Sequence, residues 1–322
     1  MKNPLVTVII TTYKRPGAIG KAINSVRGQT YKNLEIIVVD DNMFGSFDHL
    51  ETEKICTQYP EVQYVKNAKN LGGGLSRNAG IEQASGEYIA FLDDDDIYNP
   101  DKVKQQMGLF KTTNNKRLGL VYCYANRMNT EGALVGGYDN DFEGSPLYEH
   151  MLACIAGTSL WLVKKEILVA IGMFDDVPSK QDSTVILKML TKGYEVARVP
   201  ERLVDYYEHK GDGISGTKLS NIKGIKKFRD KCELSFNLLD KNQIKNVRYS
   251  FSKTLISIYM VNSLKKEAIN EFKIMVQNRP LRLNNISSLM KIVAPNLYIK
   301  YLGMVGYLKD LYANRFVKGS GN

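Results

Sequence analysis

The stretch that decides the fold reads Ser85-Gly86-Glu87-Tyr88-Ile89-Ala90-Phe91-Leu92-Asp93-Asp94-Asp95-Asp96, an apolar run that ends in four aspartates. Residues 88–92 are apolar on both faces, as strands buried inside a parallel sheet are. Four adjacent carboxylates repel one another unless a cation lies among them, and hard oxygen ligands of this kind suit Mg²⁺ or Mn²⁺. The alternative is an acidic turn before a helix, because Asn99-Pro100-Asp101 downstream is typical of a helix start.

Four more apolar runs, separated from one another by segments with helical spacing, extend this pattern along the first 125 residues. They cover residues 5–10, 34–39, 62–65 and 118–125. Strand, helix and strand at this rhythm predict an α/β fold with a mostly parallel sheet flanked by helices on both sides. Residues 126–160 are rich in Gly, Asn and Asp and are predicted to be a loop-rich insertion. Helices are predicted at 164–171 and 183–191.

Polar clusters follow three of the predicted strands directly. They are residues 11–15, 40–42 and 93–96. Because the carboxyl ends of parallel strands meet at one edge of a sheet, where such folds bind ligands, we expect the three clusters to form one site. The glycine-rich segment 70–80 precedes a helix that carries Arg77, and both helix N-termini and arginine favour phosphate. Its spacing is not that of a dinucleotide loop, so a flexible turn is the alternative.

Taken in order, these segments resemble the family 2 inverting glycosyltransferases, which have a Rossmann-like GT-A fold. The resemblance covers about residues 4–215. The motifs that carry it are Val8-Ile9-Ile10-Thr11-Thr12-Tyr13, Ile37-Val38-Val39-Asp40-Asp41, Asn70 and Gly72 with Ser76-Arg77-Asn78 and Gly80, the segment 85–96, Gly172-Met173-Phe174-Asp175, Gln181-Asp182, and Tyr206-Tyr207-Glu208-His209.

The resemblance implies a role for each matching residue in binding the nucleotide. Thr11, Tyr13 and Asp41 match positions that hold the base, usually uracil. Arg77 matches a position near the nucleotide, and Asp93 matches the first residue of the DxD motif, which usually faces the ribose. The implied ligand is a nucleotide sugar, most often a UDP-sugar.

The resemblance also implies the metal ligands and the base. Asp95 matches the DxD residue that holds Mn²⁺ or Mg²⁺ on the diphosphate, and His209 matches a histidine that in some members reaches the metal or the diphosphate. Asp182 matches the catalytic base. Taken singly, Asp182 could instead cap a helix and His209 could be a surface residue.

Two positions depart from the family pattern. Gln181 replaces the usual glutamate before the base, a change that bears on acceptor binding and leaves the base in place. Asp94 stands where serine or alanine is commoner and adds a charge to which the sequence assigns no effect.

The activity implied is that of a metal-dependent, inverting glycosyltransferase, a hexosyltransferase by the commonest pattern. The acceptor would be a hydroxyl of a glycan, lipid-linked or glycoprotein acceptor, in polysaccharide biosynthesis or protein glycosylation. The alternative is a non-catalytic module that docks on membrane or nucleic acid and whose acidic edge is structural. A nucleotidyltransferase would need a glycine-rich, lysine-containing loop after the first strand, and residues 11–15 lack the glycines.

Charge divides the chain into two predicted domains, a catalytic one over 1–215 and a basic helical region over 216–322. Residues 1–209 hold 23 basic and 27 acidic side chains, and residues 210–322 hold 21 and 7, which gives the formal charge of +10 for the whole chain. The chain is therefore not a uniformly basic nucleic-acid binder. Helices are predicted at 221–238, 241–263, 265–277 and 285–315. They would pack on the body or on another subunit, or lie at an anionic membrane.

The remaining composition predicts a cytoplasmic protein, with peripheral contact at the inner face of the membrane as one role of the basic helices. Cys56, Cys123, Cys154 and Cys232 form no close pair, so a disulfide framework is not expected. The apolar run at 5–10 is short for a signal peptide, and no run approaches the length of a membrane span.

Overall fold

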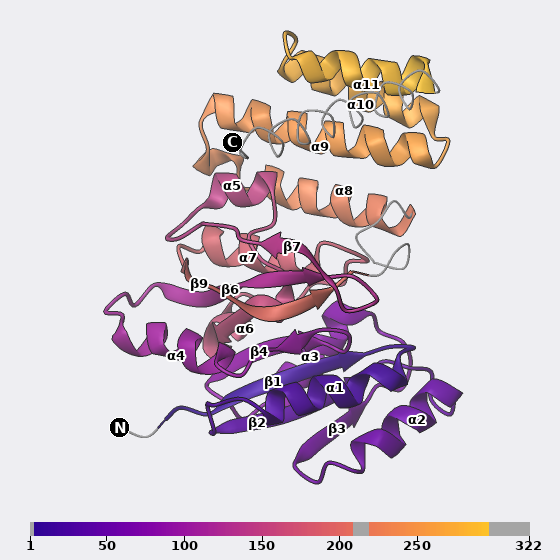
Figure 1. Ribbon diagram of the computed structural model, residues 1–322. Helices are drawn as coiled ribbons and strands as arrows, with labels where there is room; N and C mark the ends of the chain where they lie inside the picture. Colours follow the sequence, from indigo (N-terminus) through magenta and orange to yellow (C-terminus); the bar gives the residue numbers. More distant parts are fainter. Residues whose placement is uncertain (1–2, 209–218, 296–322) are drawn as a thin grey trace, which may run out of the picture.

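The computed structural model of the protein describes residues 3–208 and 219–295 (Figure 1). Within these ranges nine strands form one sheet in the order β3-β2-β1-β4-β8-β6-β9-β5, and β7 pairs with residues 125–128 of β6. The strands are β1 (Val6–Thr12), β2 (Leu34–Asp40), β3 (Val62–Lys66), β4 (Tyr88–Asp93), β5 (Ile97–Tyr98), β6 (Leu118–Met128), β7 (Leu134–Tyr138), β8 (Trp161–Lys164) and β9 (Glu195–Tyr207).

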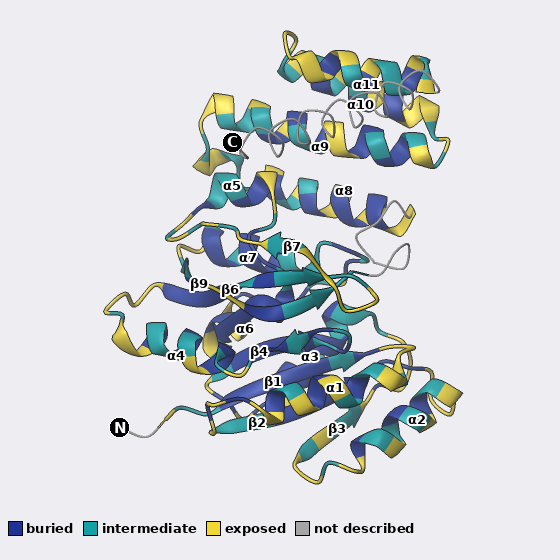
Figure 2. Cartoon of the chain, viewed as in Figure 1, coloured by how far each residue is buried: buried dark blue, intermediate teal, exposed yellow. Residues whose placement is uncertain are grey.

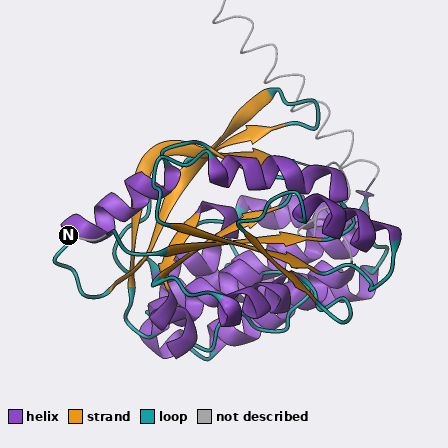
Figure 3. Ribbon diagram, turned by 90° about the horizontal axis from the view of Figure 1, so that it is seen from below, coloured by secondary structure: helices purple, strands orange, loops and turns teal. Residues whose placement is uncertain are grey.

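The first four strands are parallel and confirm the predicted α/β class. β1 lies between β2 and β4, and its residues Val8, Ile9 and Ile10 are completely buried, because helices cover both faces of the sheet. Figure 2 shows this buried centre, and Figure 3 shows helices on both sides of the strands. The helices of this half are α1 (Pro16–Arg27), α2 (Phe47–Cys56), α3 (Gly73–Gln83) and α4 (Lys102–Thr112).

The second half of the sheet is mixed. β8 is antiparallel to both β4 and β6, whereas β9 runs parallel to β6 along most of its length. Three helices and one short 3₁₀ turn accompany these strands: α5 (Leu147–Leu152), the turn η1 (Thr158–Leu160), α6 (Lys165–Ala170) and α7 (Gln181–Thr191). The helices α6 and α7 lie where helices were predicted.

The prediction of a loop-rich insertion at 126–160 was wrong in part. β6 continues to Met128 and turns back into β7, and α5 follows. Three of the glycines that suggested a loop, Gly132, Gly136 and Gly137, are inside this hairpin. A Cβ at Gly137 would lie 2.4 Å from the guanidinium of Arg202, so a side chain there would push that guanidinium aside. Glycine is thus found within a strand here and does not mark a loop.

Four helices follow the sheet: α8 (Leu219–Glu233), α9 (Lys241–Val261), α10 (Lys265–Asn278) and α11 (Leu283–Val293). They agree with the predicted segments up to residue 295; the remainder of the helix predicted at 285–315 lies outside the described residues. Their apolar sides share a second core with Met151 of α5 and Leu187 of α7, so the helical region packs directly on the elements next to the site. Among the residues described, no helix combines the length and the apolar character needed to cross a bilayer.

Candidate functional site

The three polar clusters meet at the carboxyl ends of β1, β2 and β4. Thr11 on β1 is in register with Asp93 on β4 and with Val39 on β2, so the loops that follow these strands leave the sheet side by side. Thr11 is half-buried and Tyr13 is exposed on the loop after β1. Adjacent parallel strands therefore bring together residues that are about 80 positions apart in sequence.

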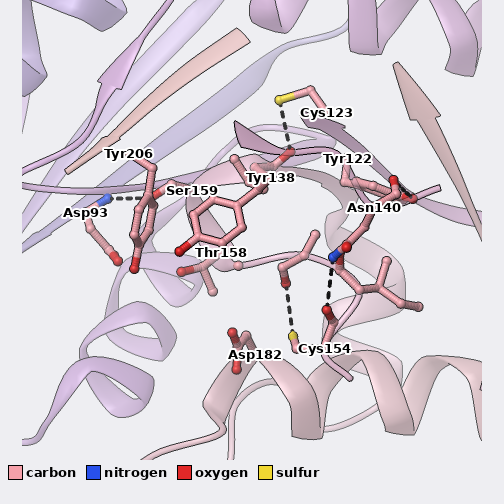
Figure 4. Close-up of a pocket in the computed structure, with 14 residues that line it drawn as sticks. Asp93, Tyr122, Cys123, Tyr138, Asn140, Cys154, Thr158, Ser159, Asp182 and Tyr206 are labelled. Carbon is pink, nitrogen blue, oxygen red and sulfur yellow. Dashed lines mark hydrogen bonds between the residues drawn. The ribbon is translucent and has the colours of Figure 1, made fainter. Parts of the chain in front are cut away.

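A cavity of about 240 Å³ opens beside this edge (Figure 4). Asp93 from the end of β4 and Asp182 from the first turn of α7 both line it. The rest of the wall is mainly aromatic and polar: Tyr122, Tyr138, Tyr206, Asn140, Cys154, Thr158 and Ser159. The two carboxylates predicted to serve the donor and the acceptor thus face one cavity.

Arg77 links the two sides of this cavity. Its Nη2 donates to Asp93 Oδ1 at 2.5 Å and its Nη1 donates to Gln181 Oε1 at 3.0 Å. The guanidinium is buried and lies 5.6 Å from the ring centre of Phe174. Helix α3 therefore fixes a cation between the end of β4 and the start of α7.

Asp94 anchors the loop after β1, which gives a role to the charge that the sequence left unassigned. The buried carboxylate accepts from Thr12 Oγ1 at 2.7 Å and from the backbone N–H of Tyr13 at 3.3 Å. Arg15 forms an ion pair with Asp94 at 3.0 Å and also pairs with Asp95. Burial raises the pKa of Asp94 to about 7, while the Arg15 charge and the Thr12 hydrogen bond oppose that shift.

Asp96 holds the last residue of β9. Its Oδ1 accepts from the backbone N–H of Tyr207 at 3.2 Å, at the end of β9. Burial, together with the charges of Asp93 and Asp95, raises the pKa of Asp96 well above its usual range. Of the four aspartates, Asp94 and Asp96 are buried and hold the loop after β1 and the end of β9, and Asp93 and Asp95 are the two more accessible ones.

Asp41 is committed to hydrogen bonds within the chain. Asn67 Nδ2 (2.9 Å) and Leu71 N (2.7 Å) donate to Oδ1, and Asn70 Nδ2 (2.9 Å) and Gly72 N (2.8 Å) donate to Oδ2. A carboxylate has about four acceptor positions, so these bonds satisfy it. In this structure Asp41 orders the glycine-rich loop before α3.

Asp182 is the second residue of α7, and one of its two carboxylate oxygens is held by hydrogen bonds. Oδ1 accepts from Ser183 N at 2.7 Å and from Ser183 Oγ at 3.3 Å. Lys180, two residues earlier, has a left-handed backbone with φ of 63°, which turns the chain sharply into α7. That turn presents the Asp182 carboxylate to the cavity.

His150 supports Asp182 from behind. It is buried, and Nε2 lies 2.8 Å from the carbonyl oxygen of Ser183, while Ile155 N donates to Nδ1 at 3.4 Å. Burial lowers the pKa of His150 to about 4. The neutral ring with its proton on Nε2 satisfies both partners, so His150 ties the first turn of α7 to the cavity wall.

The donor set at this edge fits a hard divalent cation as part of a coordination shell. Asp93 and Asp95 supply carboxylate oxygens that already attract the guanidinium groups of Arg77 and Arg15. Residues 3–208 and 219–295 contain no group of three or more His, Cys, Asp or Glu that would complete a shell. Phosphate oxygens and water would have to supply the remaining ligands. His209, the other predicted metal ligand, lies outside the described residues.

Sequence reasoning missed Arg15, His150 and Tyr122. The sequence did contain a signal for Arg15, because this cation follows the first predicted strand and the acidic cluster 93–96 follows another strand of the same predicted sheet. His150 and Tyr122 had none, because their partners at Ser183 and at Asn140 and Phe142 become neighbours only in the folded chain.

Comparison with known proteins agrees with this geometry. Residues 7–157 match the model of the family described as "Glycosyl transferase family 2". An "Uncharacterized glycosyltransferase" of Rickettsia bellii is 33% identical over 193 residues, which are 58% of this chain and 27% of that protein. The chain thus spans about a quarter of that relative's length.

Two further comparisons cover more of the chain. The Escherichia coli protein called "Putative colanic acid biosynthesis glycosyl transferase WcaA" is 25% identical over 286 residues, 83% of this chain and 97% of that protein. The crystal structure of S. aureus TarS 1-349 in complex with UDP-GlcNAc superposes with a TM-score of 0.60 at 16% identity, covering 86% of this chain and 92% of that one. This likeness confirms the predicted GT-A fold with its C-terminal helices.

Proposed function

We propose that the protein is an inverting glycosyltransferase of family 2, because residues 7–157 match the model of that family. The donor is a UDP-sugar, or less commonly another nucleotide sugar, and the group moved is a hexose. The acceptor is a hydroxyl of a glycan, lipid-linked or glycoprotein acceptor. Relatives named for colanic and teichuronic acid biosynthesis support a polysaccharide acceptor, and the TarS complex with UDP-GlcNAc supports a UDP-sugar donor.

One observation carries the proposal: Asp93 and Asp182 face the same cavity although they come from β4 and α7. An inverting displacement needs the leaving group held on one side of the anomeric carbon and a base on the other. The cavity has Asp93, which is paired with Arg77, on the side of the leaving group and Asp182 of α7 as the base. A docking module with a structural acidic edge would not require Asp182 at this cavity.

The donor side is assigned as follows. Thr11 and Tyr13 lie beside the nucleotide base. Asp41 accepts four hydrogen bonds and thereby orders the glycine-rich loop next to that base. Arg77, buried and paired with Asp93, offers positive charge for the diphosphate as negative charge develops on the leaving group.

A divalent cation belongs to the same proposal. Asp95, with Asp93 beside it and His209 as a further ligand, would hold Mn²⁺ or Mg²⁺. When bound, such an ion neutralises charge on a leaving diphosphate.

Asp182 is assigned as the general base. Its Oδ1 is held by Ser183, which leaves Oδ2 to accept the proton of the acceptor hydroxyl as that oxygen attacks the anomeric carbon. The tyrosine side chains of the cavity suit the flat apolar faces of sugar rings. No enzyme nucleophile is needed, because one displacement inverts the configuration.

The proposal is tested by hydrolysis and binding. We expect UDP with Mn²⁺ to raise the melting temperature of the protein and a panel of nucleotide sugars to show slow hydrolysis of one UDP-sugar. ADP with Mn²⁺ is the matched control for the base. A melting temperature unchanged by every nucleotide diphosphate would favour the docking module.

The basic region 216–322 is proposed to dock the enzyme where its acceptor is found, at an anionic membrane surface or on another copy of the chain. Exposed Leu283, Ile286 and Val293 on α11 support a docking role. Sedimentation with anionic liposomes would separate the two, because a membrane-docking region carries the protein into the pellet and a self-associating one changes only its mass in solution.

A further inference from the structure

The side chain of Gln181 contacts Arg77 of α3, and Gln181 directly precedes the candidate base Asp182. Its Oε1 accepts from Arg77 Nη1 at 3.0 Å, and its Nε2 donates to the carbonyl oxygen of Val177 at 3.2 Å. A side chain on Gly73 would lie 3.2 Å from Gln181 Oε1, and one on Gly74 would lie 3.5 Å from Gln181 Cδ. A Cβ at Gly73 would thus press on the amide oxygen, whereas one at Gly74 would make ordinary contact with Gln181. The amide has a partner at both ends.

The neutral charge of Gln181 matters because of what surrounds Arg77. The Arg77 side chain is 8% exposed and pairs with one carboxylate, that of Asp93. Its other contacts are uncharged: the Gln181 amide and the ring of Phe174, and its Nε has no partner among the described residues. A glutamate at position 181 would place a second carboxylate on the same buried guanidinium and leave little of its positive charge for a ligand.

We propose that Gln181 is a positioning residue that holds Arg77 beside Asp93 while leaving its charge available to the diphosphate of the donor. The inference rests on the proposed function and extends it, since it explains why this chain carries an amide where a glutamate was expected. Gln181 also precedes Asp182 directly, so the same turn of α7 positions the cation on the donor side and the base on the acceptor side.

The test compares Gln181→Glu with Gln181→Met, because glutamate adds a charge at nearly constant shape and methionine removes the hydrogen bonds without adding one. Titration calorimetry of the full chain measures Kd for UDP and for uridine, each in EDTA. We expect Gln181→Glu to weaken UDP binding about tenfold, which corresponds to about 1.4 kcal/mol. Uridine has no phosphate, so its affinity should change less than twofold.

The ratio of the UDP affinity to the uridine affinity distinguishes an electrostatic effect at Arg77 from a general loss of folding. A variant that folds poorly loses UDP and uridine alike, whereas the proposed effect is confined to UDP. We expect Gln181→Met, which releases Arg77 without neutralising it, to shift the ratio of the two affinities by less than about threefold. An unchanged ratio in Gln181→Glu, or equal losses of UDP in both variants, would overturn the inference. If wild type binds neither UDP nor uridine, with Mn²⁺ as well as in EDTA, the proposed function fails first and the inference fails with it.

Discussion

The imidazole Nε2 of His150 lies 2.8 Å from the carbonyl oxygen of Ser183, the residue that follows the candidate base. This contact joins α5 to the first turn of α7 across 33 residues of sequence. Because Ile155 N donates to the other ring nitrogen, the ring accepts at Nδ1 and donates at Nε2, and a second proton would break one of the two bonds. The position of Asp182 therefore depends on a neutral, buried histidine.

A pH dependence of stability follows from His150. Its pKa falls from 6.5 to about 4 on folding because the ring is buried; the Ser183 hydrogen bond and the charge of Asp182 oppose this shift, and the charge of Lys180 adds to it. Between these values the unfolded chain binds the proton and the folded chain does not, so stability is complete above pH 6.5 and is lost as the pH falls toward 4. From pH 7.5 to pH 5 the contribution of His150 is a loss of about 2 kcal/mol. Asp94 acts in the opposite direction over the same range, because burial raises its pKa to about 7, so the stability of wild type alone does not report the His150 contribution.

Urea unfolding of wild type and of His150→Gln at these two pH values isolates that contribution. The variant is the matched control, because an amide can donate to Ser183 without titrating. On going from pH 7.5 to pH 5, the free energy of unfolding of wild type should fall relative to that of the variant by most of the 2 kcal/mol. Equal differences in both proteins would exclude His150 as the source.

The carboxylate of Asp182 should be essential for transfer and not for donor binding. Asp182→Asn keeps an oxygen that can accept from Ser183 N but cannot take a proton, so turnover should fall about 10²- to 10⁴-fold. The Kd for UDP should stay within about twofold, since Asp182 lies on the acceptor side. Asp176→Asn, an exposed acid six residues earlier, serves as the control and should retain full turnover. Near-normal turnover in Asp182→Asn would remove the base assignment.

Asp94 should contribute to stability through the loop after β1. Asp94→Ala leaves the Thr12 hydroxyl without its acceptor and Arg15 without one of its partners, and should cost about 1–3 kcal/mol. Asp94→Asn keeps an amide oxygen for Thr12 and should cost less. The free energy of unfolding in urea distinguishes the two variants, and an alanine variant as stable as wild type would show that the loop holds without Asp94.

Two helical glycines should respond to alanine in opposite directions. A Cβ at Gly80 in α3 would lie 2.6 Å from Ile9 Cγ2 and 3.1 Å from Val39 Cγ2, so Gly80→Ala should destabilise the fold by about 1–3 kcal/mol. A Cβ at Gly108 in α4 meets nothing within 4 Å, so Gly108→Ala should stabilise it by about 0.5–1 kcal/mol. Thermal unfolding of both variants tests the pair, and shifts of the same sign would contradict the packing of α3 on β1.

Of the strands that the sequence predicted, β1, β2 and β4 are buried on both faces, whereas the edge strand β3 is only partly buried. β1, β2 and β4 are continuous apolar runs because helices cover them from each side, and such runs are visible without a structure. β9 was not predicted, although it has 13 residues, because Pro200, Glu201 and Arg202 interrupt its apolar pattern. Its pairing with β6 shifts register near Tyr124, so no simple alternation marks it.

The candidate site divides in the same way. Asp93, Asp95, Arg77 and Asp182 were predicted as site residues from their motifs, and Asp93, Arg77 and Asp182 meet at or beside one cavity. The commitment of Asp41 to four bonds within its own loop was not predicted, because three of its partners come from residues 70–72 folded back over it. His209 keeps its predicted role as a proposal.

By itself the sequence determined the α/β class, the carboxyl-end location of the polar clusters and the separation of a basic helical region from a slightly acidic body. These properties follow from local patterns: apolar runs, the residues directly after them, and charge counted along the chain. Only the tertiary structure decided which acids are accessible, which loops Asp94 and Asp41 hold, and that Gln181 and Arg77 meet across 104 positions. Such contacts depend on how helices and strands pack, and a side chain's neighbours at long range leave no periodic trace in the sequence.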